Sequence, residues 1–110
     1  MKHLLTILIA TVTLPASAEF MDGNKLLADF QDQGVVPQMH SLGYVKGVAD
    51  AHLGLIHCAP SNATGGQMRD MVRDYLIQNP GQRHHTGDLV IARVLGTKWP
   101  CPSRRQGSPA

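Results

Sequence analysis

Two cysteines constrain the fold of this chain most strongly, because a disulfide bond between them would tie two distant segments together. Cys58 and Cys101 are the only cysteines among its 110 residues. In an oxidising compartment, two cysteines in a small domain most often pair. The closed loop of about 44 residues would contribute about 4 kcal/mol on the chain-entropy model. The alternative is a thiol nucleophile beside His57, but neighbouring residues on a helix point apart, so His57 is badly placed as its base.

The N-terminal sequence indicates export to an oxidising compartment. Lys2 and His3 precede an apolar run over residues 4–14, and Ala16-Ser17-Ala18 follow it. This order is typical of a cleavable secretory signal. The run is too short for a membrane-spanning helix, which needs about 20 residues, although an uncleaved anchor is the alternative. We therefore expect residues 1–18 to be removed and the protein to reside in a bacterial periplasm, without membrane attachment.

Composition narrows the class of partner. Lys and Arg number 10 against 8 Asp and Glu, and aromatic residues make up 5% of the chain. This balance lacks the concentrated basic face that nucleic acids and membrane surfaces require. One domain over residues 19–101 is expected. Residues 102–110 are polar and rich in Pro, Gly and Ser, which predicts a flexible C-terminal tail.

The spacing of apolar residues predicts an all-α fold, a small compact bundle of about four helices tied by one disulfide. The last segment could also form a buried strand, but no second strand is available to pair with it, so we expect a helix that ends at Gly96. Gly43 and Gly47 lie one turn apart, which favours close packing within the chain over a contact between two copies. The predicted helices cover residues 23–31, 38–57, 64–79 and 82–95.

No catalytic or metal site is predicted. His84 and His85 could share a metal only from a loop, and no HExxH pattern is present, so a surface pair is favoured over a zinc site. Asp70 and Asp74 alternate with Arg69 and Arg73, which is typical of a solvated charged face. We expect a binding protein without enzymatic activity, cofactor or metal.

The chain also resembles a known family. Residues 43–51, GYVKGVADA, are similar to the signature helix of the Rap/Tai-type immunity proteins, the periplasmic partners of type VI secretion effectors. The similarity continues, in the same order, over nearly the whole mature chain. It includes Cys58-Ala59-Pro60, a helix opening at Thr64, Tyr75-Leu76, Asn79-Pro80 and Trp99-Pro100-Cys101.

The resemblance implies a function. Such a protein binds and blocks a peptidoglycan amidase effector and so protects the cell from the toxin, and members often form homodimers. The Cys58–Cys101 bond would match a family disulfide. A second cysteine pair of the family is missing here, and its places correspond to the vicinity of Gln31 and to Ser41.

We expect the partner contact in the loop between the last two helices. Proline and glycine favour a fixed turn there, and arginine is a frequent hot-spot residue. The alternative is that the loop is only a connector. The predicted contact residues are Asn79, Gln82, Arg83, His84 and His85.

A second function remains open. A periplasmic acid-stress chaperone of the HdeA kind is also small, helical and tied by one disulfide. In that case acid would protonate carboxylates and histidines and expose Met- and Leu-rich faces to client proteins.

Overall fold

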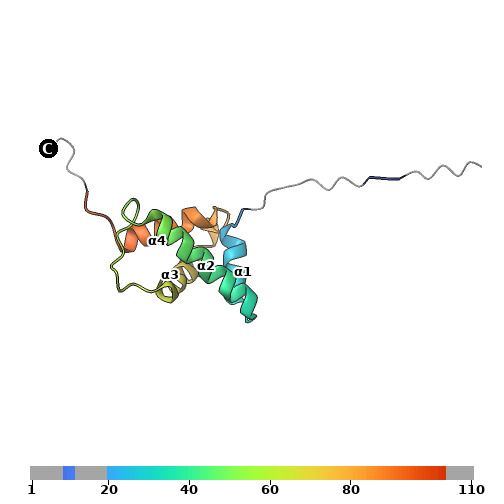
Figure 1. Ribbon diagram of the computed structural model, residues 1–110, viewed down its shortest axis with the longest axis horizontal. Coiled ribbons are helices and arrows are strands. Elements are labelled where there is room, and N and C mark those ends of the chain that lie inside the picture. Colours follow the sequence, from blue (N-terminus) through green and yellow to red (C-terminus); the bar gives the residue numbers. More distant parts are fainter. Residues whose placement is uncertain (1–8, 12–19, 104–110) are drawn as a thin grey trace, which may run out of the picture.

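A computed structural model describes residues 9–11 and 20–103 (Figure 1). Four α-helices and one short 3-10 helix pack into a bundle, and the described ranges contain no β-strand. The predicted all-α class is confirmed. Most of the predicted signal segment, 1–18, and most of the tail, 102–110, lie outside these ranges. The elements are α1 (Gly23–Gln31), α2 (Val35–His52), α3 (Gly65–Gln78), η1 (Pro80–Gln82) and α4 (Gly87–Lys98).

Helix α1 has the predicted bounds. The Asp22 side chain caps its N-terminus by accepting a hydrogen bond of 2.8 Å from the Lys25 N–H. This satisfies one of the N–H groups that the first turn leaves unpaired. Its apolar face, Leu26, Leu27 and Phe30, is buried in the core.

Helix α2 differs from the predicted range of 38–57 at both ends. It begins at Val35, so Pro37 lies in the first turn, where a missing N–H removes no helical bond. It ends at His52, and Gly54 then takes a positive φ of 81°. The N–H of Gly54 donates to the His57 carbonyl at 2.8 Å, which closes a tight turn over residues 53–57. The prediction was wrong because it treated Pro37 as a loop signal and this apolar turn as helix.

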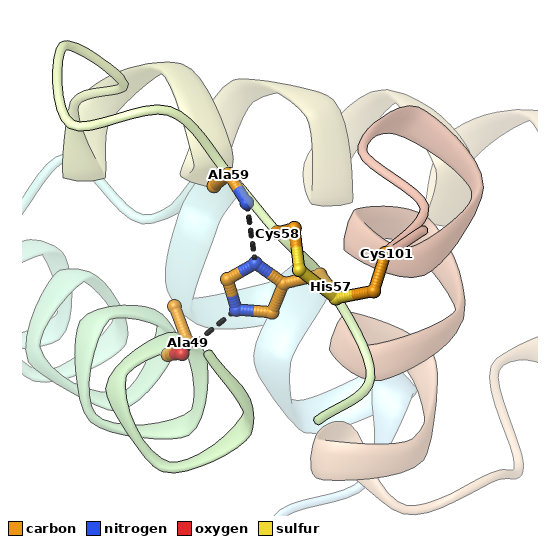
Figure 2. The surroundings of a disulfide bond; sticks show 5 residues. All are labelled: Ala49, His57, Cys58, Ala59 and Cys101. Carbon is orange, nitrogen blue, oxygen red and sulfur yellow. Dashed lines mark hydrogen bonds between the residues drawn. A yellow bond between two sulfur atoms is a disulfide. The ribbon is translucent and has the colours of Figure 1, made fainter. Parts of the chain in front are cut away.

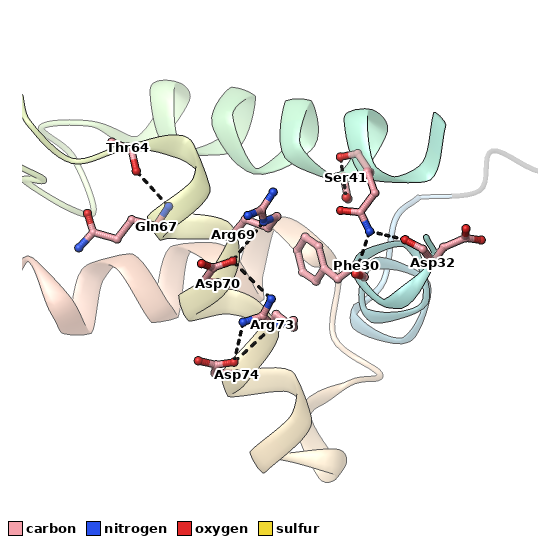
Figure 3. Close-up of polar contacts among 10 residues, drawn as sticks. Phe30, Asp32, Ser41, Thr64, Gln67, Arg69, Asp70, Arg73 and Asp74 are labelled. Atoms are coloured by element: carbon pink, nitrogen blue, oxygen red, sulfur yellow. Dashed lines mark hydrogen bonds and ion pairs between the residues drawn. The ribbon is translucent and has the colours of Figure 1, made fainter. Parts of the chain in front are cut away.

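Polar contacts hold the corner between α1 and α2 (Figure 3). The Gln38 amide donates to the carbonyls of Phe30 and Asp32, and the buried Ser41 hydroxyl donates to the Gln38 carbonyl at 3.1 Å. The second family cysteine pair would fall here, near Gln31 and at Ser41. Hydrogen bonds thus link the two segments that a disulfide would have linked.

Helix α3 follows the prediction closely. The Thr64 hydroxyl accepts from the Gln67 N–H at 3.1 Å, as expected for an N-cap (Figure 3). Met68, Val72 and Leu76 are buried, while the opposite face carries the predicted charged side chains. Those side chains pair with one another over 3.2–3.4 Å in the order Arg69, Asp70, Arg73, Asp74.

Helix α4 is a helix, as predicted, but its bounds differ. It begins at Gly87 because residues 80–82 form a separate 3-10 turn. It also continues through Gly96 to Lys98, so the expected stop at Gly96 was wrong. A Cβ at Gly96 would lie 3.1 Å from the Ile56 carbonyl oxygen. This glycine therefore allows the 53–57 turn to approach the helix.

The disulfide is confirmed (Figure 2). Cys58 and Cys101 are bonded with 4.8 Å between their Cα atoms, which joins the segment after α2 to the segment after α4. The Cys58 N–H also donates to the Trp99 carbonyl at 2.8 Å. The bond fastens the end of α4 over the shared core, whose fully buried members include Leu26, Val45, Val72, Leu76, Ile91 and Leu95.

The two glycines of α2 do not pack within the chain, contrary to the prediction. Gly43 and Gly47 are exposed, and a Cβ at either position would meet nothing within 4 Å. They leave a shallow strip on the outer face of α2. Among the described helices, none is long and apolar enough to cross a lipid bilayer.

Candidate partner-binding surface

The loop predicted to contact a partner also receives the N-terminus of α1. The Gly23 N–H donates to the His85 carbonyl and the Asn24 N–H donates to the Arg83 carbonyl, both at 2.9 Å. Loop carbonyls thus satisfy N–H groups that the first turn of a helix leaves unpaired. A Cβ at Gly23 would lie 2.8 Å from the Arg83 carbonyl oxygen, so only glycine permits this approach.

The same loop caps the C-terminus of α3. The Arg83 guanidinium donates through Nε to the Leu76 carbonyl at 2.6 Å and through Nη2 to the Ile77 carbonyl at 3.2 Å. The Asn79 side chain donates to the Tyr75 carbonyl at 2.8 Å. These carbonyls lie in the last turn of the helix, and the Tyr75 carbonyl also accepts the backbone N–H of Asn79 at 2.9 Å. Asn79 and Arg83 are therefore engaged by the protein itself.

The three remaining side chains of the predicted site are more available. His84 is exposed, and Gln82 and His85 are half-buried. The imidazole rings of His84 and His85 lie 4.1 Å apart between centroids. The structure therefore places the five predicted residues in one loop, but it divides them into two that hold α3 and three that face outward at least in part.

A network of charged side chains joins α1 to α2 on a different side. Asp29 is 5% exposed, and it lies 2.9 Å from the Lys25 ammonium and 3.1 Å from His40 Nδ1. Burial alone would raise the pKa of Asp29, but the contacts with Lys25 and His40 outweigh it and lower the pKa below its ordinary value. Because the Asp29–His40 contact joins α1 to α2 and Lys25 supports Asp29 from within α1, this network serves stability.

Tyr44, in the signature stretch, packs against the start of α4. A Cβ at Gly87 would lie 2.8 Å from Tyr44 Cε1, so the ring lies directly over this glycine. Burial and the nearby carboxylate of Asp88 raise the pKa of Tyr44. The phenol therefore stays protonated and positions α4 rather than supplying a base.

His57 is buried beside the disulfide and is fully hydrogen-bonded (Figure 2). Its Nε2 lies 2.8 Å from the Ala49 carbonyl, and its Nδ1 lies 3.2 Å from the Ala59 N–H. A carbonyl only accepts and an amide N–H only donates, so the ring carries its proton on Nε2. With Cys58 in a disulfide, this histidine ties α2 to the following segment instead of activating a thiol.

A cleft of about 240 Å³ opens beside His57, between the end of α2 and the start of α3. Lys46 and Asp50 of the signature stretch line it, together with Pro60 and Met68. The sequence reasoning did not single out this hollow. Its signal was present in the pattern, since Lys46 and Asp50 lie one turn apart within residues 43–51.

Large apolar side chains are exposed at two further places that the sequence reasoning missed. Val35 and Val36 are each 77% exposed at the start of α2, with Met39 one turn later. Leu55 is 78% exposed at the tip of the 53–57 turn. Periodicity assigned the turn to a helix, which concealed its protruding shape.

In the described part of the chain, no three His, Cys, Asp or Glu side chains gather where they could hold one ion. His84 and His85 accordingly form a pair on the loop without a third ligand beside them.

The comparison with protein families gives a match over most of the chain. The model of the Rap1a immunity proteins matches residues 22–101, which span all four α-helices and both cysteines. No curated protein matches the chain. Because the match covers well over half of the sequence, from the cap of α1 to the second disulfide cysteine, this chain belongs to the family of Rap1a immunity proteins.

Proposed function

We propose that this protein is a periplasmic immunity protein that binds and occludes a peptidoglycan amidase effector of type VI secretion. The observation that carries the proposal is the family match over residues 22–101, because immunity proteins act by binding a toxin. The protein would be an inhibitor rather than an enzyme. The cell that makes it would thereby be protected from its own toxin or that of its siblings.

The loop over residues 79–85 is the contact that we propose. Its backbone is held from two sides, through α1 and through the end of α3, so little conformational freedom is lost on binding. His84 and Gln82 would contact the effector, with His85 beside them. Asn79 and Arg83 would act mainly by keeping the loop in shape.

Two copies of the chain are proposed to pair through the outer face of α2. Gly43 and Gly47 leave room for another backbone, and Val36 and Met39 expose apolar surface on the same helix. Val36→Asp should shift a dimer toward monomer in analytical ultracentrifugation. The matched variant Leu89→Asp, on an apolar residue of α4 that is also partly exposed, should leave the association unchanged. A monomeric wild-type chain at high concentration would exclude this pairing.

The function is tested by capture followed by protection. The tagged chain is expressed in the periplasm of its host, isolated without reductant at pH 7 and near pH 3, and its partners are identified by mass spectrometry. One stoichiometric amidase at pH 7, and protection of cells from lysis by that amidase, is the expected result. Many unrelated proteins bound only in acid would favour an HdeA-like chaperone instead.

The proposed contact loop has its own test. Gln82→Ala with His84→Ala should weaken effector binding, measured by calorimetry, while leaving the unfolding midpoint nearly unchanged. Gln78→Ala with His52→Ala removes the same two side-chain types outside the loop and serves as the control. Equal affinity of both variants for the effector would show that the loop is only a connector.

A further inference from the structure

A second groove, unrelated to the proposed contact loop, crosses the outer side of α3 and α4. It has a volume of about 350 Å³, at the small end of ligand pockets. Tyr75 and Val94 form its apolar floor, and both also pack against the core. Arg93, Thr97 and Lys98 line the rest, so no acidic side chain is part of it.

The two cations of this groove differ from most others in the structure. Lys25, Arg69 and Arg73 are in ion pairs, and Arg83 caps α3. Within residues 20–103, by contrast, neither Arg93 nor Lys98 has a hydrogen bond or ion pair from its side chain. Two positive charges therefore border one apolar floor without a counter-charge.

Lys46 provides a useful comparison because it also has no ion pair with any residue that the structure describes. It lines the cleft beside His57, but Asp50 lines the same cleft and supplies a negative charge there. Among the described residues that line the groove between α3 and α4, no acidic side chain plays this part. Nor does helix geometry attract an anion to it, since the C-terminal end of α4 carries a negative partial charge. Any attraction must come from the side chains of Arg93 and Lys98.

We propose that this groove binds an acidic segment of the effector, in which a carboxylate stands next to a large apolar side chain. The carboxylate would lie between Arg93 and Lys98, and the apolar side chain would cover Tyr75 and Val94. Arginine can hold a carboxylate through two parallel hydrogen bonds, which adds direction to the charge attraction. This inference rests on the proposed function for the identity of the partner, but its chemistry follows from the groove alone.

A defined peptide tests the chemistry without the effector. The probe is acetyl-Glu-Leu-Glu-Phe-Glu-amide, titrated into the ¹⁵N-labelled chain and followed by amide chemical shifts. We expect shifts confined to Tyr75 and residues 93–98. They should disappear in Arg93→Gln with Lys98→Gln and persist in Arg69→Gln with Arg73→Gln, which removes the same charge from α3. No localised shift, or equal shifts with inorganic phosphate or with serine in place of Leu and Phe, would overturn the proposal.

The captured effector tests the biological partner. Arg93→Gln with Lys98→Gln should bind it at least about tenfold more weakly, as expected for loss of a charge-assisted hydrogen bond, and with less dependence on salt. If wild type and Arg93→Gln with Lys98→Gln bind the effector equally, the groove is not part of the interface, and the proposed function stands. If no effector binds but the peptide occupies the groove, the proposed function fails, and recognition of an acidic apolar segment stands.

Discussion

Removing the disulfide should cost this protein much of its stability. The bond joins residues separated by 43 positions, and it connects the ends of α2 and α4 across the core. Closing a loop of this length restricts the unfolded chain, and the chain-entropy model assigns the restriction about 4 kcal/mol. Small domains are stable by only about 5–15 kcal/mol. The variant Cys58→Ala with Cys101→Ala should therefore remain folded at low temperature, but with a free energy of unfolding close to zero.

The measurement is urea unfolding of the chain from residue 19, without reductant, followed by far-ultraviolet circular dichroism. A loss of about 4 kcal/mol corresponds to a drop of about 15–30 °C in the melting temperature of a domain of this size. Wild-type protein in the presence of a phosphine reductant is the matched control, because its cysteines are unpaired but its sequence is unchanged. Both samples should give the same free energy of unfolding.

Loss of the disulfide should act on the unfolded state and leave the native contacts in place. Because the bond acts on the unfolded state, native contacts such as the Cys58 N–H to Trp99 carbonyl bond should persist in the variant. Exchange of the amide at position 58 should therefore occur through global unfolding and not through a local opening. A loss smaller than about 1 kcal/mol, or selective exposure of residues 57–59 without global destabilisation, would refute this account.

Three further predictions test other contacts. Gly23→Ala should destabilise by about 1–3 kcal/mol in urea unfolding, because a methyl group would lie 2.8 Å from the Arg83 carbonyl oxygen; an unchanged midpoint would mean that α1 can move away freely. His57→Leu should cost about 2–4 kcal/mol in the same assay, since it leaves two buried backbone groups unpaired; a neutral effect would mean that water replaces the ring. Asp29 has a lowered pKa, so its stabilising contribution is present above the pKa of the unfolded chain, near 4, and is lost as pH falls through the lower folded value. Wild type should therefore lose more stability than Asp29→Asn in unfolding titrations from pH 5 to pH 2, and parallel pH curves would contradict the network.

Periodicity and capping signals were sufficient for the helices that local caps delimit. Thr64 and Asn79 bound α3 as predicted, because a cap and an Asn-Pro pair act locally. The end of α4 depends instead on a distant contact. Gly96 resembles a helix stop in sequence, but its role is to admit the Ile56 carbonyl from a turn forty residues earlier in the chain. A single sequence contains no sign of that neighbour.

The candidate site shows the same division between local and distant causes. Proline and glycine predicted a fixed turn between α3 and α4, and residues 80–82 form a 3-10 turn there. Arg83 was predicted to contact a partner. Its contacts with Leu76 and Ile77, however, are made to the last turn of α3, so its importance lies first in the fold. The groove formed by Tyr75 and Arg93 could not be predicted, because it exists only where two helices lie side by side.

The double use of the 79–85 loop has a consequence for how binding and stability are linked. Its carbonyls hold the first turn of α1, and the Arg83 side chain holds the last turn of α3, so the loop cannot change shape without releasing a helix end. A partner bound to His84 would therefore stabilise contacts on both helices, in proportion to the logarithm of its free concentration. Conversely, loss of the Arg83 cap would increase the fraction of molecules whose 79–85 loop is disordered. This would weaken binding even if Arg83 never touches the partner. Affinity lost by Arg83→Ala should consequently be recovered in part by stabilising substitutions elsewhere, whereas affinity lost by His84→Ala should not. That difference separates a residue that shapes the contact from one that makes it.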